Sequence, residues 1–323
     1  MQKELTIITV NFFSADLIKK LSTTMPDKKT LNYDWVVVDN SVDKKQIIKL
    51  KKISNIDKVI EQNDNVGFGK ANNIAVKNLK SKYYLFLNPD TMLKQKCIEK
   101  LLEFMKQNNE YVMAGPSILN TDGSIQLSAS KKYPYWWSHA IDYSPALRFI
   151  IGKLGFNKYP AMFSFDDHKK DLDPVALLGA CIIVGADDFK KAKGFDEGFF
   201  MYREETDLAH RMMGLNKKIK YLSSAKMIHM SGGTSKNNFY AEFNPDYLKS
   251  SYMFLAKWHN PFYVVFCWLL GLLGSVFSLI VFGLLGLIIY RKRNNYLKIS
   301  NICWKGVLLH LGHPLAIGYY IKR

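Results

Sequence analysis

The feature that most restricts the fold is an apolar stretch, Tyr84–Leu87, that stops at Asn88-Pro89-Asp90. An uninterrupted apolar run of this kind is typical of a parallel strand buried on both faces. Pro89 lacks a backbone N–H and cannot continue a central strand, so polar side chains follow at its carboxyl end. Open α/β sheets bind ligands at this end of their strands. Asp90 is therefore a candidate ligand of a hard divalent cation, and the alternative is an ordinary Asx or proline turn.

Strand-like and helix-like segments alternate through the first third of the chain. The predicted strands are 5–10, 33–38, 58–61 and the stretch from Tyr84, and the predicted helices are 17–21, 43–52, 65–79 and 94–105. This alternation predicts an α/β fold with a mostly parallel central sheet flanked by helices. Further strands are predicted at 111–119, 124–127, 175–184, 219–222 and 225–229.

The second predicted strand ends at Asp39-Asn40. A carboxylate at this place commonly accepts hydrogen bonds from a base or a ribose, although a turn residue is the simpler interpretation. Further on, Gly67-Phe68-Gly69 does not complete a dinucleotide fingerprint, because Asn72 stands where the third glycine is needed. The glycines still allow backbone to approach a phosphate or sugar closely, or they mark a helix start capped by Asn65.

Three carboxylates, Glu204, Glu205 and Asp207, crowd the start of a predicted helix, directly after the aromatic segment Phe199–Tyr202. Acidic side chains at a helix N-terminus are favoured by its dipole, and Asp207 and Arg211 have the spacing of an ordinary ion pair. Partial desolvation by the aromatic segment would also raise a carboxylate pKa to a range useful for a general base.

Two further sites are indicated downstream of the central strands. The apolar run at 175–184 is interrupted by Gly179-Ala180, where small residues would let a ligand approach the backbone. His229 follows the last predicted strand and is a candidate for metal or phosphate binding, although a lone histidine is more often structural.

The charge balance favours an anionic partner. Lysine and arginine total 45 against 28 aspartates and glutamates, a formal net charge of +17. The four cysteines lie far apart without metal-ligand spacing, which is typical of reduced thiols in a cytosolic setting. No signal peptide is predicted at the start, because the first residues read as a strand.

The segment 131–170 is rich in aromatic and basic residues. Three interpretations remain open: an interfacial membrane segment, a sugar-stacking acceptor surface, or a helical lid. Residues 241–260 are predicted as a helix that docks on the first domain. We therefore expect a domain at 1–240 that contains the 131–170 insert.

Residues 261–290 carry no charge, and a membrane span needs about 20 apolar residues. Arg291-Lys292-Arg293 closes this segment and favours the cytoplasmic side, where a nucleotide-dependent domain would also lie. Either a hairpin turned at Gly271–Gly274 or Gly283–Gly286, or one span that violates the charge rule, would fit. Residues 291–323 are predicted as a basic amphipathic tail.

Seven motifs occur together in one order: TVNF at 9–12, VVDNS at 37–41, NVGFGKANN at 65–73, FLNPDT at 86–91, LLGACIIV at 177–184, GFDEGFFMYREETDL at 194–208 and IH at 228–229. In this order the chain resembles the family 2 glycosyltransferases of GT-A fold, and among these the rhamnosyltransferase-like group. The resemblance implies an inverting transfer from a nucleotide-diphosphate sugar with Mg²⁺ or Mn²⁺. The family generally reads Glu-Asp-x-Asp, whereas this chain reads Glu204-Glu205-Thr206-Asp207.

By position in these motifs, the resemblance implies Glu205 as the catalytic base, Asp90 and His229 as metal ligands, and Glu204 and Asp207 on the acceptor side. The implied donor-binding residues are Thr9, Asn11, Asp39, Asn65, Gly67, Phe68, Asn72, Asn88, Gly179 and Ala180.

The implied acceptor is lipid-linked or a polysaccharide, with L-rhamnose as a candidate sugar. The expected location is the cytoplasmic side of the cell membrane, in cell-surface glycan synthesis, without a nucleic-acid partner. The alternatives are a non-catalytic, membrane-anchored sugar-binding protein of the same fold and a nucleotidyltransferase.

Overall fold

The computed structural model describes residues 3–77, 79–156, 159–230 and 244–312. The chain forms two compact units, one of Met1–Lys131 with Phe163–Asn237 and one of Lys132–Met162 with Asn238–Arg323. The expected domain at 1–240 included all of 131–170. The structure instead groups 132–162 with the C-terminal unit, because the helices of this segment pack against a long C-terminal helix.

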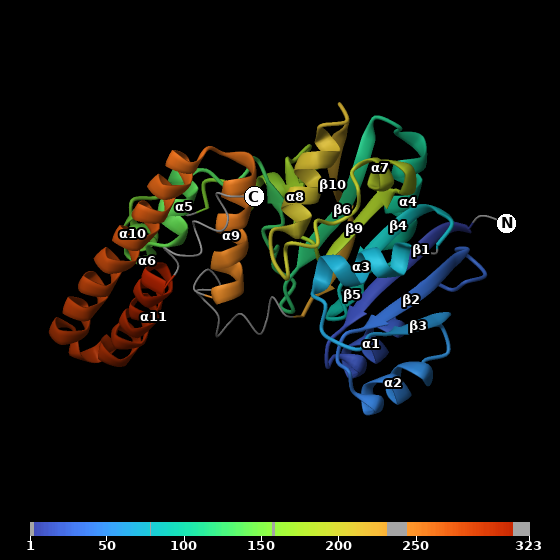
Figure 1. Cartoon of the computed structure of the whole chain (residues 1–323), viewed down its shortest axis with the longest axis horizontal. Coiled ribbons are helices and arrows are strands. Elements are labelled where there is room, and N and C mark those ends of the chain that lie inside the picture. The colour runs from blue at the N-terminus through green and yellow to red at the C-terminus, as the bar shows by residue number, and fades with distance from the viewer. Residues whose placement is uncertain (1–2, 78, 157–158, 231–243, 313–323) are drawn as a thin grey trace. The chain divides into compact units, whose positions relative to one another are not determined.

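The first unit is built around a mixed sheet whose described strands follow the order β3-β2-β1-β4-β9-β6-β10-β5 (Figure 1). The pairs β1–β2, β1–β4, β2–β3 and β6–β10 are parallel, whereas β9 and β5 run antiparallel to their neighbours. The predicted mostly parallel sheet is therefore confirmed. The bounds are β1 Lys3–Asn11, β2 Tyr33–Asp39, β3 Lys58–Glu61, β4 Ser81–Leu87, β5 Thr91–Leu93, β6 Tyr111–Leu119, β9 Cys181–Gly185 and β10 Lys218–His229, and a small second sheet pairs β7 Ala129–Ser130 with β8 Ala176–Leu177.

Helices cover both faces of this sheet because alternate strand residues are apolar on both sides. Leu85 belongs to the core shared with α1 (Ala15–Ser22), α2 (Lys44–Lys51) and α4 (Cys97–Gln107). The next residue, Phe86, faces the opposite side, where its ring centroid lies 4.9 Å from that of Phe195 and 5.2 Å from that of Phe189. The helices that contact the sheet on that side are α3 (Phe68–Val76), α7 (Ala186–Lys191) and α8 (Glu204–Met213), and a short 3-10 turn occupies Asp167–Lys169.

The structure differs from the predicted strands in three places. The strands predicted at 219–222 and 225–229 form one continuous strand, β10. The run at 175–184 forms two strands, because the chain leaves the extended conformation at Leu178–Ala180 between β8 and β9. Residues 124–127 form no strand, and only Ile125 makes an isolated bridge, to Leu119.

The second unit is helical in its described residues and contains α5 Trp136–Asp142, α6 Pro145–Lys153, α9 Pro245–Trp258, α10 Pro261–Ile288, a 3-10 turn at Tyr290–Lys292 and α11 Arg293–Gly312. Within 241–260, the residues predicted as a docking helix, Pro245–Trp258 form α9, and 241–243 lie outside the described residues. Its side chains Leu248, Tyr252 and Leu255 share a buried cluster with Tyr143 and Val264. This helix is thus part of the core of the second unit.

Of the two alternatives left open for 261–290, the hairpin is wrong, because α10 runs without interruption through all four glycines. Added to Gly286, a Cβ would lie 2.9 Å from Leu297 of α11; at Gly274 it would lie 3.0 Å from Ser144. The glycines therefore let neighbouring segments approach α10 closely, as small residues do between packed helices. The chain turns after α10, and α10 is long and apolar enough to cross a membrane.

Candidate functional site

The carboxyl ends of β1 and β2 place Asn11 beside Asp39, because these residues pair in the parallel register. Both side chains are fully buried. Asn11 donates its amide N–H to Asp39 Oδ1 (2.5 Å), and the Ser41 hydroxyl donates to the same oxygen (2.7 Å). Among the described residues, no group donates to the second oxygen, Asp39 Oδ2. A buried carboxylate oxygen is stabilised by a donor, so this atom fits an N–H or O–H of a ligand.

The predicted glycine motif shapes the neighbouring loop. Asn40 donates its side-chain N–H to the Gly67 carbonyl (3.1 Å), and Asn65 accepts from the Gly67 N–H (3.1 Å). Gly67 has φ +84°, and a Cβ there would lie 2.4 Å from the Phe200 carbonyl, which accepts a hydrogen bond from the Phe68 N–H (2.9 Å). The close approach at Gly67 is therefore to the protein's own backbone, which fits the interpretation of this motif as a helix start shaped by Asn65.

Asn72 is also part of this packing. Its side chain is buried and donates an N–H to the Phe68 carbonyl (3.0 Å). The ring of Phe68 packs edge-on against Phe195, with centroids 6.1 Å apart. Both residues thus hold the segment that leads into α8.

The turn after β4 brings Asp90 to the end of β10. The short strand β5 pairs with β10 so that Thr91 lies opposite His229. Asp90 Oδ2 lies 3.4 Å from His229 Nε2, and the side chains are 10% and 12% exposed. The second imidazole nitrogen, Nδ1, lies 3.3 Å from Gln126 Oε1. The two residues predicted as metal ligands are therefore adjacent and nearly buried.

The contact with Gln126 favours one tautomer of the imidazole. Gln126 Oε1 can only accept, so Nδ1 carries the hydrogen that it receives. His229 Nε2 then presents a lone pair to the Asp90 carboxylate, and two acceptors at this distance need a proton or a metal cation between them. Gln126 could not be predicted from sequence, since it lies outside every motif, in a loop after β6 that carries it beside β10.

The same turn links the metal-ligand candidates to the predicted base. Asn88 donates its backbone N–H to the Ala180 carbonyl (2.9 Å). The neighbouring Gly179 packs against Glu205, since a Cβ at Gly179 would lie 3.4 Å from Glu205 Cβ and Cγ. The small residues between β8 and β9 thus bring the α8 carboxylate to the end of β4.

Glu204 and Glu205 differ in their surroundings. Glu204 is 5% exposed, and no described group donates to its Oε2, so burial and the neighbouring Glu205 charge raise its pKa well above the usual range. Glu205 accepts a hydrogen bond from the Thr206 hydroxyl (3.2 Å), and desolvation raises its pKa as well. Glu205 lies on the Gly179 side, whereas Glu204 packs toward Gly69. A carboxylate with a raised pKa suits proton transfer.

We expect Glu204→Gln to raise Tm at pH 8. A raised pKa favours the protonated form of Glu204 in the fold, so the stability that it contributes is present at acidic pH and lost as pH rises through that pKa. Glutamine cannot ionise and therefore removes this loss. Each kcal/mol of unfolding free energy regained raises Tm by about 2–4 °C. Thermal unfolding at pH 8 and pH 4 measures the effect, with the exposed Glu110→Gln as control. An equal gain at both pH values would contradict the assignment.

Two predicted site residues make structural contacts instead. Thr9 is fully buried, and its hydroxyl accepts from the Trp35 indole N–H (3.0 Å), so it supports the sheet rather than a donor. Asp207 is fully buried and accepts from Arg211 Nε (2.8 Å). Arg211 also donates to the Gly194 carbonyl (2.7 Å). This pair anchors the turn before α8 and gives Asp207 a structural contact in place of one with an acceptor.

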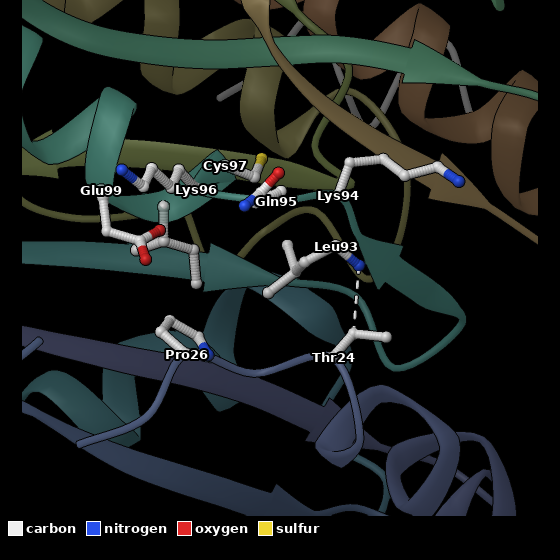
Figure 2. A pocket seen from close by; sticks show the side chains of 9 residues that line it. Thr24, Pro26, Leu93, Lys94, Gln95, Lys96, Cys97 and Glu99 are labelled. Carbon is white, nitrogen blue, oxygen red and sulfur yellow. Dashed lines mark hydrogen bonds between the residues drawn. The ribbon is translucent and has the colours of Figure 1, made fainter. Parts of the chain in front are cut away.

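A separate pocket of about 190 Å³ lies where β5 meets α4, and Figure 2 shows the Thr24 hydroxyl accepting from the Leu93 N–H (3.1 Å) at its wall. The other lining residues include Lys94, Lys96 and Glu99. None of the residues predicted for the site lines this pocket, so the candidate site is the group of side chains at the strand ends.

Sequence comparisons identify relatives of this chain. The profile of the family described as glycosyl transferase family 2 matches residues 6–170. "Rhamnosyltransferase WbbL" of Escherichia coli (strain K12) is 28% identical over 265 residues, which cover 78% of this chain and 92% of that protein. An "N-acetylglucosaminyl-diphospho-decaprenol L-rhamnosyltransferase" of Mycobacterium tuberculosis (strain CDC 1551 / Oshkosh) is 25% identical over 209 residues, 61% of this chain and 66% of that protein.

Solved structures share the fold. The mannosyltransferase PcManGT from Pyrobaculum calidifontis, in complex with GDP-Man and Mn²⁺, has a TM-score of 0.55 at 9% identity over 96% of this chain and 88% of that one. GalNAc-T7 with UDP, GalNAc and Mn²⁺ has a TM-score of 0.54 at 12% identity over 80% of this chain and 48% of that one. The predicted GT-A fold is thereby confirmed.

Proposed function

The chain belongs to glycosyl transferase family 2, and from this premise we propose that it transfers L-rhamnose, with inversion, from a nucleotide-diphosphate donor to a lipid-linked acceptor. The names of the two rhamnosyltransferases support the sugar, and the diphospho-decaprenol in one name supports the acceptor. The observation that carries the proposal is the link from Asp90 and His229, through Asn88 and Ala180, to Glu205.

In this proposal, Asp39 binds the nucleoside. Its Oδ1 already accepts from Asn11 and Ser41, which fixes the carboxylate. Its Oδ2 then accepts an N–H of the base or an O–H of the ribose. The polar groups at the ends of β1 and β2 thus orient the donor, with Asn65 shaping the adjacent loop.

Asp90 and His229 fit a divalent cation, Mg²⁺ or Mn²⁺, because an oxygen and a nitrogen lone pair face one another in a nearly dry setting. Among the described residues no third histidine, cysteine or carboxylate joins them, so a diphosphate would complete the coordination. When bound, the cation supplies positive charge to the leaving diphosphate.

Glu205 acts as the general base. The acceptor hydroxyl oxygen attacks the anomeric carbon, the bond from that carbon to the diphosphate oxygen breaks, and the hydroxyl proton moves to the Glu205 carboxylate. One displacement from the face opposite the leaving group inverts the configuration. The position of Glu205 beside Gly179 supports this role.

We also propose that the enzyme works on the cytoplasmic side of the cell membrane, in cell-surface glycan synthesis, with a polysaccharide as the other acceptor class. The net charge of +17 and the apolar helix α10 support this location. Nucleotide sugars as substrates favour the cytoplasmic side.

A screen of nucleotide sugars tests the proposal. We expect saturable release of nucleoside diphosphate with one donor, and most simply with a nucleotide-diphosphate rhamnose. Release of diphosphate from a nucleoside triphosphate would indicate the nucleotidyltransferase alternative. Binding without any release, in the presence of acceptor, would indicate a non-catalytic sugar-binding protein.

Gln126→Leu is expected to weaken Mn²⁺ binding by about 10–100-fold, the usual effect of removing an outer-shell partner. Leucine cannot accept the Nδ1 hydrogen of His229, so the imidazole loses its fixed orientation. Electron paramagnetic resonance titration of Mn²⁺ measures the affinity without turnover. Gln107→Leu, on the surface of α4, is the control, and unchanged affinity in Gln126→Leu would exclude the positioning role.

A further inference from the structure

One side of α10 is exposed and apolar along its whole length. The exposed residues Phe262, Phe266, Leu269, Leu273, Ile280 and Leu287 recur every three or four residues or at multiples of this spacing. Their exposed fractions reach 88% at Phe262 and 72% at Leu287. The opposite side of α10, which includes Cys267, Ser275 and Phe282, is buried against the other segments of the second unit. A continuous apolar surface of this length marks an interaction site.

The middle of α10 is hydrogen-bonded to residues 143–146, at the connection between α5 and α6. Ser275 Oγ donates to the Tyr143 carbonyl (3.3 Å), and Ser278 Oγ accepts from the Ala146 N–H (3.1 Å). If α10 crossed a bilayer, these mid-helix contacts would draw this connection into the hydrocarbon. The ion pair of Arg148 with Asp142 (3.4 Å) would enter with it. Charged groups at that depth are strongly disfavoured.

The packing of α11 along α10 also argues against an orientation in which α10 spans the bilayer. It packs along α10, with Leu297 against Gly286 and the Ser300 hydroxyl donating to the Leu279 carbonyl (3.3 Å). Its outer side carries the exposed charges Lys298 and Lys305. A pair of spanning helices would place these ammonium groups in lipid, whereas a helix pair lying at the interface keeps them in water.

The turn between the two helices is basic. Arg291, Lys292 and Arg293 are exposed and, with Tyr290 and the first residues of α11, line a hollow of about 480 Å³. Cationic side chains near a membrane surface are attracted to anionic lipid headgroups, and an exposed tyrosine suits the same interfacial zone. Charge complementarity therefore favours an anionic bilayer over a second protein as the occupant of the apolar face.

We propose that α10 docks in one leaflet, parallel to the membrane plane, with its exposed apolar face in the lipid and Arg291–Arg293 at the phosphates. This inference rests on the membrane location proposed above and specifies how the chain is held at the membrane. It also resolves the conflict between the basic end of α10 and a single span, because neither end of the helix crosses the bilayer.

Nitroxide depth measurements on the full chain test the orientation. The described cysteines are all buried, so spin labels react at single added sites on the exposed face: Phe266→Cys, Leu273→Cys, Ile280→Cys and Leu287→Cys. In vesicles of phosphatidylcholine and phosphatidylglycerol, we expect similar shallow depths at all four sites. Depth that peaks at Leu273 and Ile280 and falls toward both ends would overturn the proposal in favour of a span.

Vesicle sedimentation tests whether a lipid bilayer covers the exposed apolar face of α10. The double variant Leu273→Glu with Ile280→Glu should lose binding both to vesicles of phosphatidylcholine alone and to anionic vesicles that also contain phosphatidylglycerol. Ile48→Glu, at an exposed apolar site on α2, should bind normally. Replacing Arg291, Lys292 and Arg293 with glutamine should lower binding to the anionic vesicles by roughly 10–100-fold. Unchanged melting temperatures check folding. A lipid-independent dimer abolished by the glutamates would instead assign the face to a second copy. These assays involve no sugar transfer, so their failure leaves the proposed reaction intact.

Discussion

Replacing Glu205 with glutamine is expected to lower the transfer rate by about 10²–10⁴-fold, the usual effect of losing a general base. Glutamine keeps the size and polarity of the side chain but cannot take the proton of the acceptor hydroxyl. Donor affinity should change little, because Asp39, Asp90 and His229 are untouched. Glu205→Asp should retain measurable activity, since it keeps the carboxylate.

The pH dependence of kcat/KM is an independent test of Glu205 as the general base. Desolvation raises the pKa of Glu205, and a base must be ionised to act, so kcat/KM should fall as pH decreases through that raised pKa. The exposed Glu110→Gln is the matched control. If Glu205→Gln transfers sugar at nearly the wild-type rate, Glu205 is not the base. Glu204 is then the first candidate, because Asp207 is held by Arg211.

The second large effect is expected at Asp90. Alanine removes the oxygen that faces His229 Nε2, so Mn²⁺-dependent donor binding should weaken by more than the ~10–100-fold typical of an outer-shell partner. Calorimetry with the nucleoside diphosphate, with and without Mn²⁺, separates the metal contribution from nucleoside binding. The exposed Asp166→Ala is the control. Equal donor affinity of Asp90→Ala and wild type in Mn²⁺ would exclude Asp90 as a metal ligand.

Much of the first unit could be predicted from local sequence pattern. The strands β3 and β6 have the predicted ends, because short apolar runs bounded by polar residues specify them directly. The functions of the glycines could not be predicted in this way. Gly67 meets Phe200, and Gly274 meets Ser144, across more than a hundred residues of sequence. Periodicity contains no information about such contacts.

In the candidate site, too, some features could be predicted from the sequence and others could not. The motifs that resemble the family contain Asp90, His229 and Glu205, and in the structure Asp90 lies beside His229 while Glu205 packs against Gly179. Thr9 and Asp207 belong to the same motifs, but their side chains point into the core toward Trp35 and Arg211. Membership in a motif therefore does not distinguish a ligand contact from a supporting one, since that depends on the direction of each side chain.

The stereochemistry of the product is the most direct test of an inverting transfer assisted by Glu205. The enzyme is incubated with its donor, Mn²⁺ and a prenyl-diphosphate-linked sugar, and the linkage is read by nuclear magnetic resonance. We expect acceptor-dependent release of one nucleoside diphosphate per linkage formed, with the anomeric configuration of the transferred sugar opposite to that in the donor. A product that retains the donor configuration would contradict the single displacement assisted by Glu205.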